Sequence, residues 1–174
     1  MPPASETFIR RGTSRDAPVL RAILNDTFES TWLPELTPAA AQRYRDEDRP
    51  SVYIRERGAE FRVAEYDGQV VGFVDWDADF VNALHVHSSH VQRGVGSRLM
   101  DLAENEIASA GFPNARLETD TFNSRSRAFY EKRGYREADR YPDIEWNSGL
   151  TTLLLVKSLS RAGGLDAGCE HKSE

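Results

Sequence analysis

Apolar side chains recur at helical spacing in the first part of the chain. Residues 8–10 read as a short strand, and a threonine or serine after it can cap a helix. The side chains expected on one face of that helix are Leu20, Ile23, Leu24, Thr27, Phe28 and Thr31. Pro34 closes this segment, and a Thr-Pro pair at 37–38 predicts the start of a second helix that runs to about Tyr44.

The middle of the chain changes to the two-residue period of β-strands. Residues 61–66 and 70–76 flank Asp67-Gly68, a dipeptide typical of a hairpin turn. Residues 81–86 read as the next strand after a polar turn. We therefore expect antiparallel strands in this part of the chain.

The second half alternates strands and helices. A helix is expected over residues 94–110 because it carries one apolar stripe. The stripe consists of Val95, Leu99, Leu102, Ala103 and Ile107. Residues 115–119 read as a strand, and a further helix is expected between an Asn-Ser cap at 123–124 and Gly134.

Two more strand-like stretches, at residues 135–139 and 151–157, complete the order β-α-α-β-β-β-α-β-α-β-β. This order predicts a mixed α/β domain with antiparallel strands early and a βαβ unit late. A chain of 174 residues has room for one ordinary domain. Residues 160–174 have no apolar period, so we expect a flexible tail there and a single domain over residues 1–159.

Composition narrows the class of protein. Hydrophobic residues make up 39% and charged residues 29%, as in a folded, soluble protein. The net charge of −6 argues against a nucleic-acid partner, which would need a basic face. No apolar run approaches the roughly 18 residues of a membrane span, and the start does not resemble a secretory signal. Cys169 is the single cysteine, so no internal disulfide can form, and we expect a cytoplasmic protein. Because no membrane span is present in the sequence, we expect no membrane partner.

A glycine pair stands where a strand leads into a helix. In the run 92–97, Gly94 and Gly96 let the backbone turn tightly and present N–H groups at a helix start. Such a helix start binds phosphate groups well. Arg93 and Arg98 add charge, and Ser97 adds a hydroxyl donor.

Three alternatives compete with this phosphate site. The glycines could form only a tight turn. A dinucleotide-binding fingerprint would need a third glycine where Leu99 stands, although Glu118 lies at a suitable distance for a ribose contact. A Walker loop is excluded because no Gly-Lys-Ser/Thr sequence follows.

These residues together resemble the GNAT superfamily of acyl-CoA-dependent N-acetyltransferases. The matching parts are the strand 84–86, the Gly94-Val95-Gly96 turn, Asn123, and the run 128–135, which reads A-F-Y-E-K-R-G-Y. The element order agrees with the family from about residue 8 to residue 157. One position departs from the family pattern, since Val91 stands where a glutamine or arginine is usual.

The resemblance implies a mostly antiparallel central sheet flanked by helices, and acetyl-CoA as cosubstrate. Acetyl-CoA would lie between the strand that ends at Val86 and the strand that starts near Ala115. Its pyrophosphate would sit on the glycine turn, and the 84–86 backbone would bind pantetheine and polarise the thioester. The expected cofactor-binding residues are Leu84, His85, Val86, Gln92, Arg93, Gly94, Val95, Gly96, Ser97, Arg98, Asn123, Ser126 and Tyr130.

Acetylation of an amine requires two proton movements. By resemblance Tyr130 protonates the departing thiolate, while the alternative makes it an aromatic core residue. The ammonium proton could pass to His85 or His87, or through water to Glu118 or Asp120. Of these groups, His85 and Glu118 are the catalytic candidates beside Tyr130, and a purely structural role remains the alternative for each histidine.

No metal site is expected. Three nearby histidines, at positions 85, 87 and 90, raise the alternative of zinc, but further ligands are not evident. The acidic stretch 75–79 begins like a calcium loop, yet Phe80 and Val86 stand where glycine and glutamate are required.

The acceptor site is expected at aromatic and acidic residues outside the cofactor half. The candidates are Phe28, Trp32, Trp76, Asp143, Glu145 and Trp146. The two carboxylates could receive a cation, with a cation–π contribution from an indole ring, or they could belong to a solvated loop.

We expect direct acetyl transfer to a primary amine of a small molecule or peptide. The alternative is a sensing module that binds acyl-CoA without turnover. A nicotinamide-dependent enzyme is disfavoured because Leu99 stands where its fingerprint needs a glycine. The sequence leaves open whether the protein forms a homodimer.

Overall fold

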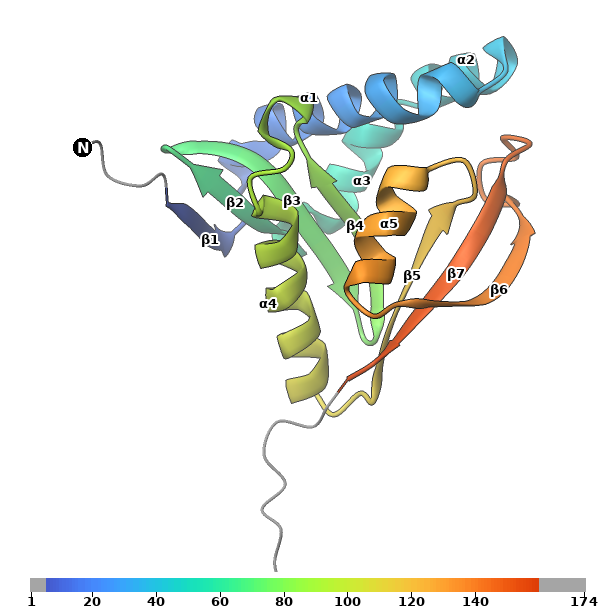
Figure 1. The fold of residues 1–174 in the computed structure, drawn as a ribbon. Helices are drawn as coiled ribbons and strands as arrows, with labels where there is room; N and C mark the ends of the chain where they lie inside the picture. Colours follow the sequence, from blue (N-terminus) through green and yellow to red (C-terminus); the bar gives the residue numbers. More distant parts are fainter. Residues whose placement is uncertain (1–5, 160–174) are drawn as a thin grey trace, which may run out of the picture.

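The structure is a computed structural model that describes residues 6–159. Its strands form one seven-stranded sheet in the order β1-β2-β3-β4-β5-β7-β6 (Figure 1). The strands are β1 (Thr7–Arg11), β2 (Arg62–Tyr66), β3 (Gln69–Asp77), β4 (Phe80–Val86), β5 (Asn114–Asp120), β6 (Arg136–Pro142) and β7 (Thr151–Ser158). The α-helices are α1 (Ala17–Thr27), α2 (Pro38–Asp46), α3 (Arg49–Arg57), α4 (Val95–Ser109) and α5 (Ser124–Lys132).

The pairing of β4 with β5 is the irregular part of this sheet. All other neighbouring strands pair antiparallel, whereas β4 and β5 run parallel. Their register contains only two pairs, Phe80 with Arg116 and Val81 with Leu117. Beyond Val81 the two strands diverge, and the end of β4 keeps a strand partner only on its β3 side (Figure 1).

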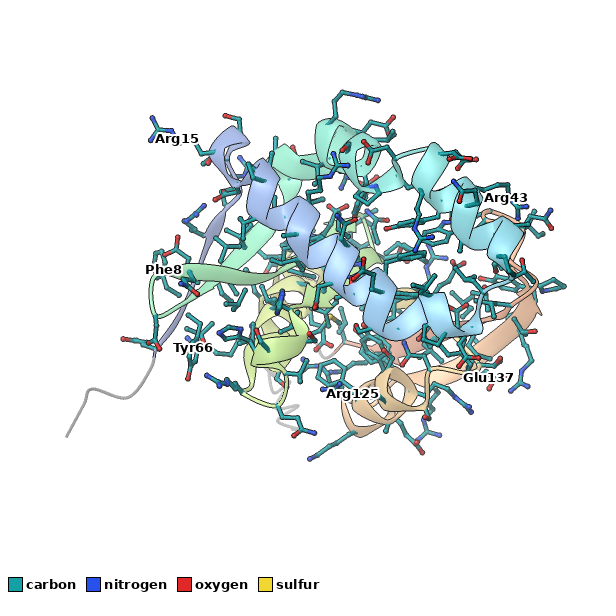
Figure 2. All side chains as sticks on the ribbon, turned by 90° about the horizontal axis from the view of Figure 1, so that it is seen from above. Phe8, Arg15, Arg43, Tyr66, Arg125 and Glu137 are labelled. Atoms are coloured by element: carbon teal, nitrogen blue, oxygen red, sulfur yellow. The ribbon has the colours of Figure 1, made fainter. Side chains whose placement is uncertain are left out.

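Helices cover both faces of the sheet. Neighbouring strand residues point to opposite faces, so Val63 and Phe73 pack against α1 whereas Ala64 and Val74 belong to the core under α4 and α5. Figure 2, which views the molecule from above, shows the α1–α2 run extending from near Arg15 to Arg43. None of the helices described is long and apolar enough to cross a membrane.

The predicted fold class is confirmed, and each of the predicted strands is present with small differences in its ends. Two features were not predicted. Helix α3 has no apolar stripe that would reveal it, because its four buried or half-buried apolar residues lie close together at positions 50–54 and its other five residues are polar. The first helix does not continue regularly to Pro34: it changes to a π-helical turn at Phe28–Trp32 and then to a 3₁₀ turn.

A buried carboxylate fixes the point where β4 leaves β5. The register of β3 with β4 shifts after Asp75, so that Asn82 is an extra residue, a β-bulge that bends its strand. Asp75 is fully buried and accepts hydrogen bonds from the Asn82 amide (3.1 Å), the Tyr53 hydroxyl (2.6 Å) and the Arg57 guanidinium (2.8 Å). The network ties α3 to the bulge, and the bulge directly follows the last pair of β4 with β5.

A second buried carboxylate joins α4 to the C-terminal half. Glu104 accepts hydrogen bonds from the Tyr135 hydroxyl (2.9 Å), Arg133 Nη2 (3.1 Å) and Lys157 Nζ (2.8 Å). Because the side chain is only 8% exposed, removing it leaves two cations partly buried without their shared partner.

We expect Glu104→Ala to lower the free energy of unfolding by about 2–4 kcal/mol, measured by urea denaturation. Glu106→Ala is the matched control, because Glu106 lies on the same helix and is exposed; its effect should stay within about 0.5 kcal/mol. Equal midpoints for the two variants would show that the Glu104 network contributes nothing specific.

Candidate active site

Three adjoining cavities open around the end of β4. The α4–α5 cavity, of about 320 Å³, lies between β4 and the first turns of α4 and α5. The inter-strand cavity, of about 200 Å³, lies between the diverging ends of β4 and β5. The α1–α3 cavity, of about 540 Å³, lies between β4 and the helices α1 to α3. His85 and Trp32 line all three, and Tyr130 lines the first two.

The start of α4 forms one wall of the α4–α5 cavity. Gly94 has φ +79°, a left-handed conformation that glycine adopts without strain, and its carbonyl accepts the hydrogen bond from Arg98 N. The N–H groups before Arg98 therefore lack intrahelical acceptors and carry the partial positive charge of a helix start. This wall can bind a phosphate group.

Most of the expected cofactor-binding residues lie in this one cavity. They are Leu84, His85, Val86, Gln92, Gly94, Val95, Gly96, Ser97, Asn123, Ser126 and Tyr130. Two expected residues lie elsewhere: Arg93 and Arg98 are exposed outside the lining, and the Arg93 guanidinium lies over the Tyr66 ring at 5.3 Å. Arg125, in the first turn of α5 (Figure 2), supplies a cation to the lining instead.

Arg125 was missed although its position carries a signal. Asn123 caps α5 by accepting a hydrogen bond from Ser126 N (3.1 Å), as its sequence position predicts. The residues just after such a cap lie in the first helical turn. Because α5 begins beside the start of α4, a basic residue there contributes to the same positive wall.

Tyr130 places a phenol at the junction of two cavities. The side chain is 8% exposed and packs edge-on against Phe129 and Tyr135, with ring centroids 5.1 and 5.5 Å away. No described residue hydrogen-bonds to its hydroxyl. Burial raises the pKa of Tyr130, so the hydroxyl is protonated at neutral pH and can act as a donor.

His85 is held in one tautomer by a threonine on α1. The Thr27 hydroxyl donates to the Leu24 carbonyl (3.2 Å), so it accepts the proton of His85 Nδ1 at 2.9 Å. The lone pair then lies on Nε2. The ring lies between Phe73 and Trp32, at centroid distances of 5.3 and 6.0 Å, and burial lowers its pKa to about 4. Sequence reasoning missed Thr27, because it assigned this residue to the apolar face of its helix.

Carboxylates line the inter-strand cavity on its β5 side. Glu118 accepts a hydrogen bond from the Tyr141 hydroxyl, and Asp120 accepts one from Trp32 Nε1 (2.8 Å). Burial raises the pKa of Asp120, and the negative charges of Asp143 and Glu118 raise it further against the opposing indole hydrogen bond. Asp120 is therefore a stronger base than an ordinary carboxylate.

Five of the six expected acceptor residues line these cavities, and Trp32, Glu145 and Trp146 line both the inter-strand and the α1–α3 cavity. Trp32, Asp143, Glu145 and Trp146 line the inter-strand cavity, and Phe28 lines the α1–α3 cavity. Trp76 lies outside both linings, where the Arg62 guanidinium lies over its ring at 5.4 Å.

The loop between β6 and β7 lines one side of the inter-strand cavity. Asp143 accepts hydrogen bonds from Trp146 N (3.1 Å) and the Ser148 hydroxyl (2.6 Å), and so holds its own loop in shape. The Trp146 ring packs against Tyr44, which stacks on Phe28 at 3.8 Å. This aromatic contact fastens the loop to the helices on the other side of the cavity.

Of the remaining histidines, His90 lines the α4–α5 cavity, whereas His87 lines none of the three cavities. In the turn after β4, the Ser89 hydroxyl hydrogen-bonds to both His87 and His90, each at 2.7 Å. Within residues 6–159, no group of three or more His, Cys, Asp and Glu side chains could hold a metal ion. Cys169 and the expected tail lie outside the described residues.

The pKa of His85 predicts a pH dependence of stability. The folded value of about 4 lies below the ordinary 6.5, so between these values the unfolded chain binds a proton that the folded protein does not. The contribution of neutral His85 is fully present above pH 6.5 and is lost as the pH falls toward 4. In urea unfolding between neutral pH and about pH 4.5, His85→Gln should show a shallower loss of stability than the parent. Parallel curves would contradict this assignment.

Comparison with known proteins agrees with this geometry. A model of the acetyltransferase (GNAT) family matches residues 17–135. An uncharacterized N-acetyltransferase of Methanocaldococcus jannaschii is 32% identical over 60% of this chain and 69% of its own. Blasticidin-S acetyltransferase of Streptomyces morookaense is 36% identical over 55% and 68%.

A solved structure extends the similarity to the whole fold. The PaiA N-acetyltransferase of Thermoplasma acidophilum, solved in complex with coenzyme A, superposes with a TM-score of 0.69 at 18% identity. The match covers 88% of this chain and 99% of that one. The chain therefore belongs to the acetyltransferase (GNAT) family, the acetyl-CoA-dependent N-acetyltransferases that its motifs resemble.

Proposed function

We propose that the protein transfers the acetyl group of acetyl-CoA directly to a primary amine of a small molecule or peptide. The observation that carries the proposal is the meeting of two cavities at Tyr130 and His85, where β4 and β5 separate. One cavity has a phosphate-binding wall, and the other has carboxylates and indole rings. A donor and an acceptor can thus enter from different sides and meet at one point.

The α4–α5 cavity suits acetyl-CoA. We assign the diphosphate to the start of α4 together with Arg125, and the extended pantetheine arm to the edge of β4 near residues 84–86. That edge has no strand partner on the β5 side, so its peptide groups can pair with pantetheine amides as a further strand would. A backbone N–H there can stabilise the charge that develops on the thioester oxygen.

Transfer then follows from the groups at the junction. The amine nitrogen attacks the thioester carbonyl, the C–N bond forms and the C–S bond breaks. Tyr130 donates its proton to the departing thiolate, because its hydroxyl is protonated, unengaged and at the junction. The nitrogen releases a further proton as it becomes an amide, and this proton returns through water to Tyr130. The only cysteine, Cys169, is remote in sequence from every residue of the site, which supports direct transfer.

The ammonium proton must leave before the attack. With a pKa of about 4, His85 is too weak a base to retain a proton from an amine whose pKa is near 10. We assign His85 Nε2 to accept a hydrogen bond from the incoming amine. The proton leaves through water bound by Glu118 and Asp120, which line the same cavity. A cytoplasmic location, where acetyl-CoA is made and used, suits this chemistry.

Replacement of Tyr130 tests the acid. We expect Tyr130→Phe to lower kcat about 100-fold, with the KM for acetyl-CoA changed less than about twofold, in an assay of thiol release. Tyr135→Phe is the control, since it also removes a phenol hydroxyl but one bound to Glu104. An unchanged kcat would remove Tyr130 from the mechanism. Coenzyme A binding without thiol release from any amine would favour the acyl-CoA-sensing alternative.

A pair of glycine substitutions tests the phosphate wall. Gly94 and Gly111 flank the two ends of α4 and both have positive φ, at +79° and +95°. A methyl group added at either position would meet open space, so backbone strain is the main cost. Alanine at either should therefore cost about 1 kcal/mol of stability.

Only Gly94→Ala should weaken coenzyme A binding, by about five- to tenfold in isothermal titration calorimetry, because only that strain displaces the N–H groups of the wall. Equal affinities in the two variants would place the diphosphate elsewhere.

A further inference from the structure

Negatively charged side chains line the inter-strand cavity, and an arginine beside it, Arg49, lies over the Trp146 ring at 4.9 Å. Four carboxylates line it: Glu118, Asp120, Asp143 and Glu145. Among the described residues of its lining there is no lysine or arginine. The adjoining α4–α5 cavity contains Arg125 and no carboxylate, so charge of opposite sign is separated between the two cavities.

The partners of these carboxylates are neutral. Those of Glu118 and Asp120 are a phenol and an indole N–H, and Asp143 binds backbone N–H groups and a serine hydroxyl. The cavity's carboxylates are half-buried or exposed, whereas the buried Asp75 pairs with an arginine and the buried Glu104 with an arginine and a lysine. The carboxylates of the cavity therefore repel one another, and a bound cation would reduce this electrostatic repulsion.

A second feature indicates that a ligand belongs in this cavity. The Tyr130 side chain is more than nine-tenths buried, lines the cavity, and has a hydroxyl to which no described residue hydrogen-bonds. The ring is buried but the hydroxyl itself is open toward the cavity, so it can hydrogen-bond to a group bound there. Indole rings of Trp32 and Trp146 form apolar walls that suit the methylene chain between two amines.

We propose that the acceptor is a small diamine or polyamine, held by a second ammonium group among Glu118, Asp120 and Glu145 while its first amine is acetylated. This inference rests on the proposed function and adds the substrate class. The ammonium first loses a proton to solvent, and the neutral amine then forms the C–N bond as the C–S bond breaks. Tyr130 protonates the thiolate and is reprotonated by the proton that the nitrogen releases, through water, as it becomes an amide. The second ammonium keeps its charge throughout, so it acts only in binding.

The test compares amines of one length and different charge. Thiol release is measured with 1,4-diaminobutane, 1-aminobutane and 4-aminobutanoate, in which the far end is positive, neutral and negative. We expect kcat/KM to be about tenfold or more higher for the diamine than for 1-aminobutane, and lowest for 4-aminobutanoate. The advantage should shrink as salt is raised, because ions screen the attraction.

Charge removal in the cavity should reduce this discrimination. In the double variant Asp120→Asn with Glu145→Gln, the ratio of kcat/KM for the diamine to that for 1-aminobutane should fall about tenfold. Asparagine can still accept the Trp32 N–H, so the wall keeps its shape. Glu106→Gln changes the net charge on an exposed face of α4 and should leave the ratio unchanged.

The possible results distinguish failure of the diamine proposal from failure of the proposed acetyltransferase activity. Equal kcat/KM for the three amines would overturn the inference and leave the acetyltransferase standing, as would a lysine peptide preferred over every diamine. If no amine releases thiol, the proposed function fails. In that case, titration of 1,4-diaminobutane into the coenzyme A-bound protein tests whether the cavity's carboxylates bind the diamine. Binding that the double variant weakens would support the diamine proposal, and the absence of binding would overturn it.

Discussion

The separation of β4 from β5 is the constraint on which the site depends. Two parallel pairs hold the strands together at residues 80–81, and beyond them the peptide groups of β4 face a cavity instead of a neighbour. Inside a sheet such groups are normally paired, so the opening leaves hydrogen-bonding capacity that a ligand can use. Reactants can meet in the middle of the domain without any strand having to move.

Two buried carboxylates keep this opening in shape from opposite sides. Asp75 fixes the bulge at Asn82 and joins it to α3, on the side of the α1–α3 cavity. Glu104 joins α4 to the end of α5 and to β7, on the side of the α4–α5 cavity. Each carboxylate connects elements that are distant in sequence. The walls of the site therefore keep their relative positions through a few charged contacts, in addition to apolar packing.

Much of the fold could be predicted from the sequence because strand and helix periods, turn glycines and caps are local signals. Helix α3 was missed because its apolar residues lie close together and form no helical stripe. The glycine turn and Tyr130 were singled out through motifs. Arg125 follows a helix cap that the sequence shows, but its nearness to the glycine turn, like the contact of Thr27 with His85, depends on packing between distant elements. Trp76 shows the converse: its aromatic character suggested the acceptor site, but it lies beside Arg62 instead.

The π-helical turn at Phe28–Trp32 has an evolutionary consequence. Such a turn contains one residue more than an α-helical turn, so it re-phases every side chain that follows it. In this protein it accompanies the contact of Trp32 with Asp120. Loss of a single residue there would bring a different side chain to the place of Trp32, which lines both the α4–α5 and the inter-strand cavity, and would leave the glycine turn untouched.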